Sequence, residues 1–181
     1  MQKQNNISAS HYVFIDECGV NTNMSRRYAR SLLGERAHDA IPLHRGRTTT
    51  IISSVRLDGE KVPMVMDGAM NGPRFRDYVE NHLAPTLHKD DIVVMDNLPT
   101  HKVSGIREAI EAVGAHLLYL PPYSPDLNPI EEMWSKIKAI LRKLKARTQS
   151  ALLLAIPDAF QAVCTNDILG WFSHAGYYTN S

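Results

Sequence analysis

The chain has 181 residues, 44% hydrophobic and 22% charged, with a net charge of +1, which suits one globular domain. This near-neutral charge excludes the strongly basic footprint of a dedicated DNA-binding module. Cys18 and Cys164 are far apart without metal-ligand spacing, which argues against disulfides and structural zinc. The apolar runs are too short for a signal peptide or a bilayer span, so we expect a cytoplasmic protein without a membrane partner.

The first half of the chain predicts a flexible start and then three strands. Residues 1–10 are polar, and the apolar residues 11–15 predict a buried strand that ends at an aspartate. The arginine-rich residues 21–46 have no periodicity and predict a long excursion between two strands. The β-branched residues 48–57 and the segment 61–66, joined by an Asp-Gly turn, predict a hairpin.

The second half of the chain alternates predicted helices and strands. An Asn-Gly-Pro start predicts a helix over 71–87, and an apolar run predicts a strand at 92–95. A helix is predicted over 101–113, followed by a strand at 117–120 and a long helix that begins at Pro129. The remaining predicted elements are a helix at 150–163 and an aromatic segment, 167–178, that packs back on the body.

This order of elements predicts one α/β domain over residues 11–181. An antiparallel meander followed by strand–helix–strand units gives a mixed five-stranded sheet with helices on both faces. The carboxyl ends of central strands are where open α/β sheets place their functional sites.

Three carboxylates are the candidate catalytic residues. Two predicted strands end in Asp16 and Asp96, and Glu131 lies in the first turn of the long helix. Each has an ordinary explanation on its own, as a turn residue or as a favourable charge at a helix N-terminus. Together they would repel one another without a cation, and hard oxygen ligands suit Mg²⁺ or Mn²⁺. Two such ions, with Asp16 shared between them, would serve phosphoryl transfer.

The segment YLPPYSPDLNPIEEMWSKIK at 119–138 resembles the signature of the mariner-like superfamily of transposases, and more narrowly its bacterial insertion-sequence branch. That family has a DDE triad with thirty-four residues between its second aspartate and its glutamate. Positions 97 to 130, thirty-four residues, separate Asp96 from Glu131 here. FIDECG and VVMDNLPTHK also resemble the family's first two acidic strands. The resemblance implies a ribonuclease H-like fold.

The resemblance also implies an activity and partners. A water molecule would cut DNA at the transposon ends, and the freed 3′-hydroxyl would attack target DNA, generally at TA dinucleotides. Family members carry helix-turn-helix modules before the catalytic domain and work as dimers that bridge two ends. Because the first acidic strand begins near residue 11, either a separate protein supplies such a module or this chain is a fragment, and we expect a homodimer on nucleoid DNA. The physiological metal and the end sequence stay open.

Several neighbours of the three carboxylates are candidates for DNA contact or site support. Glu132 lies about 100° around the helix from Glu131, and the family spacing favours Glu131 as the metal ligand. The other candidates are Asn97, His101, Lys136, Lys138 and Arg142. Two alternative functions stay open: a nuclease of the same fold, and a non-catalytic transposon remnant that binds DNA or a transposase partner as a regulator.

Overall fold

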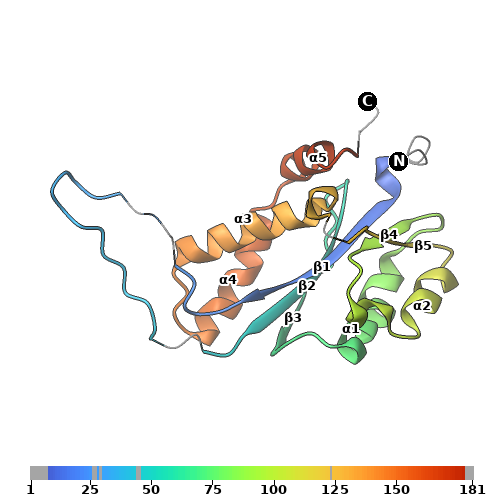
Figure 1. Ribbon diagram of the computed structural model, residues 1–181, viewed down its shortest axis with the longest axis horizontal. Helices are drawn as coiled ribbons and strands as arrows, with labels where there is room; N and C mark the ends of the chain where they lie inside the picture. Colours follow the sequence, from blue (N-terminus) through green and yellow to red (C-terminus); the bar gives the residue numbers. More distant parts are fainter. Residues whose placement is uncertain (1–7, 26–27, 29, 44–45, 123, 178–181) are drawn as a thin grey trace.

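The computed structural model describes residues 8–177, except 26–27, 29, 44–45 and 123. Its centre is a five-stranded sheet of order β3-β2-β1-β4-β5 (Figure 1). β1 pairs antiparallel with β2 and parallel with β4, so the sheet is mixed as predicted. The strands are β1 (Tyr12–Val20), β2 (Thr49–Arg56), β3 (Met64–Asp67), β4 (Ile92–Met95) and β5 (His116–Tyr119).

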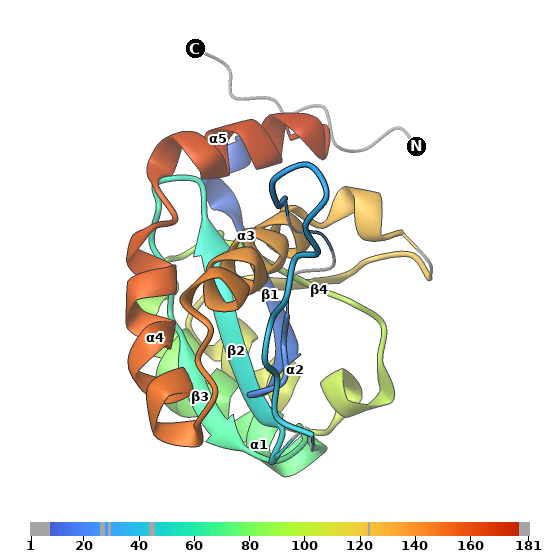
Figure 2. The same ribbon diagram turned by 90° about the vertical axis from the view of Figure 1, so that its left-hand side faces the viewer.

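Helices cover both faces of the sheet, which confirms the predicted architecture (Figure 2). The helices α3 (Pro129–Leu144), α4 (Gln149–Gln161) and α5 (Thr165–His174) pack on one face. On the other face lie α1 (Gly72–Tyr78) and α2 (Ile106–Ala112). Within the described residues no single helix is long and apolar enough to cross a bilayer. Together α4 and α5 have the length and composition of a bilayer span, but the two helices are bent by 76° relative to each other.

Strand β1 is fully sandwiched between the two helical layers, and its side chains alternate between them. Phe14 and Cys18 belong to the core under α3, α4 and α5, whereas Val13 and Ile15 belong to the core under α1 and α2. This alternation follows from the two-residue period of a strand. Even-numbered residues of β1 therefore face α3, and odd-numbered residues face α1 and α2.

The strand that carries Asp16 is longer than predicted. Its apolar run stops at residue 15, but β1 continues to Val20 because β2 pairs with it as far as Val20 and Thr49. Asp16 thus lies inside a strand, and the prediction that it ends one was wrong. At Asp16 the backbone of β1 pairs with Ser53 of β2, which fixes this position more firmly than a strand end would.

Two predicted helices are interrupted. The helix predicted over 71–87 changes to a π turn at Val79–Leu83 and a 3-10 turn at Ala84–Thr86, where Pro85 cannot donate a backbone hydrogen bond. The helix predicted over 101–113 is a 3-10 turn at Pro99–Lys102 followed by α2. Gly105 separates these two pieces because its φ of 97° lies in the left-handed region, which favours glycine.

The excursion between β1 and β2 contains neither helix nor strand in its described residues, and it projects from the body (Figure 1). Its base is held by the segment after α3, where Lys145 Nζ lies 2.9 Å from Asp39 Oδ1 and Arg147 Nη1 donates to the Met24 carbonyl over 2.7 Å. At the N-terminus, residues 1–7 of the predicted flexible stretch lie outside the described chain. Ala9–His11 form a 3-10 turn, and Ala9 is buried.

Candidate active site

Pairing between β1 and β4 brings the two aspartates side by side. The parallel register aligns Phe14 with Val94, and Asp16 and Asp96 each lie two residues further along. A two-residue step keeps the same face of the sheet, so both carboxylates follow side chains that point toward α3. Asp96 comes directly after the last residue of β4, and its Oδ1 accepts a hydrogen bond from the backbone N–H of Leu98 over 3.1 Å.

Helix α3 brings the third carboxylate to the same place. Pro129 occupies the first turn, where a missing N–H costs nothing, and Glu131 follows within that turn. One turn further, the buried Trp134 donates from Nε1 to Asp16 Oδ2 over 3.1 Å. Asp16, Asp96 and Glu131 all line one cavity of about 420 Å³. Trp134, predicted only as a core residue, therefore also anchors Asp16.

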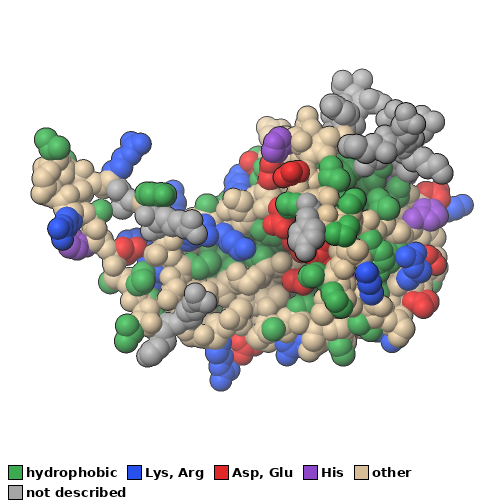
Figure 3. Space-filling view, viewed as in Figure 1, with side chains coloured by type: hydrophobic (Ala, Val, Ile, Leu, Met, Phe, Trp, Pro, Cys, Tyr) green, Lys and Arg blue, Asp and Glu red, His purple; other side chains and the backbone are tan. Residues whose placement is uncertain are grey.

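The cavity has an acidic floor and an apolar wall. Asn97 and Asn128 add amide groups, and the wall is made of Leu98, Leu120, Pro121, Pro122 and Pro125. Figure 3 shows acidic side chains gathered near the middle of this face, with basic side chains close by. Asn128 Oδ1 is buried and has no hydrogen-bond partner among the described residues, because this side chain does not cap α3.

The electrostatics of the three carboxylates are those of a site that needs positive charge. Burial, and after it the nearby charges of Glu131, Glu17 and Asp96, together raise the pKa of Asp16 to about 8. Burial would also raise the pKa of Asp96, but contact with His101 and the Leu98 N–H lowers it overall. Asp96 is therefore ionised at neutral pH, whereas Asp16 keeps its proton up to about pH 8 when no cation lies beside it.

Within the described chain, no three His, Cys, Asp or Glu side chains stand close enough together to enclose one metal ion. This spacing still fits Mg²⁺, which usually takes only one or two carboxylates and completes its shell with water and substrate phosphate. The raised pKa of Asp16 is what removal of a cation from a carboxylate cluster would produce. Asp16, Asp96 and Glu131 are thus suited to hold divalent cations.

His101 lies behind Asp96 and is fully buried, which favours site support over DNA contact among the two roles predicted for it. Its Nδ1 lies 2.5 Å from Asp96 Oδ1, although the angle is poor for a hydrogen bond, and its Nε2 lies 3.0 Å from Glu17 Oε2. Burial would lower the pKa of His101, but the two carboxylates raise it to about 9. Sequence reasoning missed Glu17, although a charged residue inside a central strand always calls for a partner.

Two other candidates, Glu132 and Lys136, contact residues of α5. Glu132 Oε1 lies 2.5 Å from His174 Nδ1 on α5 and does not line the cavity that holds Asp16 and Asp96. This placement agrees with the preference for Glu131 over Glu132. Lys136 forms an ion pair with Asp167, also on α5. Its ammonium group therefore ties two helices together, and a DNA contact would have to break that pair.

Two basic side chains continue the helix face that carries Glu131. Lys138 lies two turns after Glu131, and Arg142 one turn after Lys138. Burial raises the pKa of the Cys18 thiol to about 12, and the charge of Lys138 acts to lower it. The charge of Lys138 thus acts on Cys18, two residues beyond Asp16, and Lys138 and Arg142 form a basic stretch along α3 beyond Glu131.

The family model described as DDE superfamily endonuclease matches residues 11–153. The chain belongs to this family. The Tcb2 transposase of the nematode Caenorhabditis briggsae is 29% identical over 102 residues, which cover 54% of this chain and 37% of that protein. The residues matched by the family model contain all five strands of the sheet. The nematode relative does not test the predicted bacterial branch.

Solved structures share the fold. The Mos1 transposase paired-end complex with a left transposon end aligns with a TM-score of 0.75 at 19% identity, covering 93% of this chain and 52% of that chain. The Mos1 catalytic domain with raltegravir and Mg aligns with a TM-score of 0.66 at 16% identity, covering 91% and 78% of the two chains. The predicted ribonuclease H-like fold is thereby confirmed. The chain spans about half of the transposase in the paired-end complex.

Proposed function

We propose that this chain is the catalytic domain of a cut-and-paste DNA transposase and that Asp16, Asp96 and Glu131 hold two divalent cations. The observation that carries the proposal is the convergence of these carboxylates on one cavity, in a chain of the DDE endonuclease family. The charges of both Glu131 and Asp96 act on Asp16, so Asp16 is the carboxylate that we assign to both ions. Mg²⁺ is present in one of the similar solved structures, and Mn²⁺ has the same ligand preference.

Bound cations would activate the attacking oxygen and stabilise the leaving one in an in-line displacement at phosphorus. In the first transfer, water attacks a phosphate at the transposon end, and the bond from phosphorus to the 3′-oxygen breaks. In the second, that 3′-hydroxyl attacks a target phosphate and displaces the target's own 3′-oxygen. The chain needs no nucleophilic side chain, and its work is to place carboxylates around the phosphate and to exclude bulk water with the proline-rich wall.

DNA is the proposed partner, and the basic stretch of Lys138 and Arg142 is the surface beside the cavity that would follow its backbone. Recognition of the transposon end is assigned to a separate helix-turn-helix protein, and pairing of two ends to a homodimer formed on DNA. Insertion at TA dinucleotides and a bacterial insertion-sequence origin are further parts of this proposal.

The test is cleavage of a labelled duplex that carries candidate transposon ends, with Mg²⁺, Mn²⁺ or EDTA. We expect metal-dependent nicking that Glu131→Gln and Asp96→Asn each reduce by on the order of 10³-fold, the loss that several kcal/mol of transition-state stabilisation represents. Glu111→Gln on α2, which only pairs with Arg107, is the matched control and should cut normally.

The outcomes separate the proposal from its alternative. Activity that survives in both Glu131→Gln and Asp96→Asn would overturn the assignment of the carboxylates. Binding of end DNA without cleavage under any metal, even with the helix-turn-helix module supplied, would favour the non-catalytic regulator instead.

A further inference from the structure

Three side chains in contact connect the helical layer of α1 and α2 to the acidic cavity. They run from Glu17 through the buried His101 to the back of Asp96. Glu17 Oε2 lies 3.0 Å from His101 Nε2, and His101 Nδ1 lies 2.5 Å from Asp96 Oδ1. The exposed fraction falls to 0% at His101, between 17% at Glu17 and 39% at Asp96. One imidazole therefore bridges a carboxylate outside the acidic cavity to a carboxylate that lines it.

The His101 ring has little freedom to move. It stacks on Phe75 of α1 with ring centroids 4.1 Å apart and planes at 29°. Its backbone carbonyl accepts a hydrogen bond of 2.9 Å from the Tyr119 hydroxyl at the end of β5. These contacts fix the plane of the ring, but a half-turn about the Cβ–Cγ bond would exchange the two edges of the ring and keep the stacking. Only a partner at Nε2 fixes which edge of the ring faces Asp96.

Glu17 is that partner, and its position follows from the alternation of β1. Asp16 points toward α3, so the next residue points toward α1 and α2, where His101 lies. A carboxylate on the covered face of a central strand is costly unless a charged group pairs with it. Glu17 and Asp16 thus lie on opposite faces of one strand. Asp16 lines the acidic cavity, whereas Glu17 contacts it only from behind, through His101 and Asp96.

We propose that Glu17 is a positioning residue that acts through His101 to hold the Asp96 carboxylate in the orientation required for a divalent cation. This inference rests on the proposed function, because it assigns the cation to Asp96. Both contacts from the protein, from His101 and from the Leu98 N–H, fall on Asp96 Oδ1. The other oxygen, Oδ2, is then the one presented to the cavity. Groups behind metal ligands commonly change metal affinity by about 10- to 100-fold when they are removed.

Two conservative variants separate hydrogen bonding from charge. Glu17→Gln keeps the length of the side chain and an oxygen that accepts from His101 Nε2, but it loses the negative charge. Glu17→Asp keeps the charge but withdraws the carboxylate from Nε2 by one methylene. If Glu17 acts by positioning, Glu17→Gln should behave like the natural protein and Glu17→Asp should not. If it acts only through its charge, the order is reversed.

The first readout is Mn²⁺ binding by titration calorimetry. We expect Glu17→Asp to weaken Mn²⁺ binding by about 10-fold, the lower end of such effects, and Glu17→Gln to change it by less than about 3-fold. The matched control is Glu80→Asp on the edge of the second helical layer, where Glu80 accepts from Arg76 over 2.6 Å and contacts neither His101 nor the cavity. Its affinity should be unchanged.

The second readout needs no metal. In protein labelled with ¹⁵N at histidine, the Nε2 proton of His101 should be protected and sharp in the natural protein and in Glu17→Gln, and broadened by ring rotation in Glu17→Asp. Unchanged His101 signals in Glu17→Asp would overturn the inference, as would equal loss of Mn²⁺ affinity in both variants. If the natural protein bound no Mn²⁺, the proposed function would fail. The positioning role of Glu17 would fail with it, because that role assumes a cation at Asp96. If the natural protein binds Mn²⁺ and both Glu17 variants bind it with the same affinity, only the role of Glu17 is overturned and the proposed function stands.

Discussion

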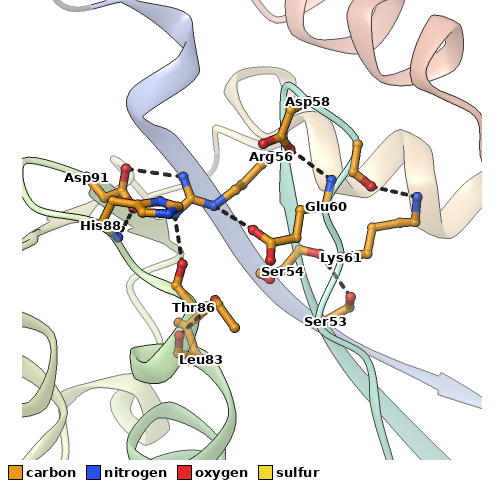
Figure 4. A network of polar contacts seen from close by, with 11 residues as sticks. Ser53, Ser54, Arg56, Asp58, Glu60, Lys61, Leu83, Thr86, His88 and Asp91 are labelled. Atoms are coloured by element: carbon orange, nitrogen blue, oxygen red, sulfur yellow. Dashed lines mark hydrogen bonds and ion pairs between the residues drawn. The ribbon is translucent and has the colours of Figure 1, made fainter.

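Two aspartates, the buried Asp91 and the half-buried Asp16, lie near opposite ends of β4 in opposite electrostatic surroundings. Asp91 precedes the strand, is only 2% exposed, and forms an ion pair with the buried Arg56 (Figure 4). Its carboxylate also accepts a hydrogen bond of 2.6 Å from the His88 backbone N–H. Burial would raise the pKa of Asp91, but these partners lower it below its usual value. The negative charge at this end is neutralised by the chain itself.

At the other end of β4, beside Asp16 of β1, the negative charge is not neutralised. Asp16 has a tryptophan N–H as its partner, and its charged neighbours Glu131, Glu17 and Asp96 are all acidic. Its pKa moves up to about 8, whereas that of Asp91 moves down. One sheet thus holds a charge pair that stabilises the fold and a charge cluster that opposes it. Unfavourable charge that a fold retains is typical of a functional site, and here it marks where a cation belongs.

The largest expected effect is a loss of stability when the ion pair between Arg56 and Asp91 is broken. Arg56→Met keeps much of the apolar stem but leaves Asp91 buried and unpaired, so it should lower the free energy of unfolding by about 3–5 kcal/mol. Urea denaturation followed by circular dichroism measures this loss.

The double variant Arg56→Met/Asp91→Asn removes the uncompensated charge and should recover much of that stability. Asn keeps an oxygen that can accept from the His88 N–H. A double variant as unstable as Arg56→Met alone would mean that the arginine acts through its other contacts, with Glu60 and with the Thr86 carbonyl.

The acidic end should respond to pH and metal in the opposite direction. Between about pH 4 and pH 8 the unfolded chain has lost the Asp16 proton while the folded chain still holds it, so metal-free stability falls as the pH rises. Asp16→Asn removes this term and should stabilise the metal-free protein at pH 8 by on the order of 2 kcal/mol, with little effect at pH 4. Urea denaturation in EDTA at the two pH values measures the difference.

Metal should reverse the sign of that comparison. A cation that binds only the folded state at a hundredfold excess over its Kd adds about 2.7 kcal/mol, so Mg²⁺ should stabilise the natural protein and not Asp16→Asn. Equal stabilisation of both proteins by Mg²⁺ would show that the cation binds elsewhere.

The sequence predicts most of the fold because its signals are local. The apolar run Ile92–Met95 is bounded by aspartates, and the structure has β4 at those residues. The Asn-Pro start and the apolar stripe of α3 predict a helix from Pro129, where the helix begins. The site follows from the same signals, because Asp96 and Glu131 each lie next to an element boundary that the sequence marks.

What the sequence does not predict depends on partners distant along the chain. β1 extends past Asp16 because β2 pairs with it, more than thirty residues later. The break before α2 comes from Gly105, whose backbone conformation no periodicity reveals. The pairing of Glu17 with His101 joins residues 84 positions apart, and only the packing of β1 against the turn after β4 brings them together.

The smallest expected effect tests how far the functional end of the molecule extends along α3. If DNA follows the helix face beyond Glu131, Lys138→Ala should weaken DNA binding a few-fold and reduce the slope of log affinity against log salt by about 0.9, the contribution of one phosphate contact. Arg107→Ala on α2 is the control, since it removes one positive charge from the opposite helical layer and should leave the slope unchanged. Binding isotherms at several salt concentrations compare the two. An equal fall in slope for both variants would mean that DNA senses only net charge, and the basic stretch beside the acidic cavity would then have no specific role.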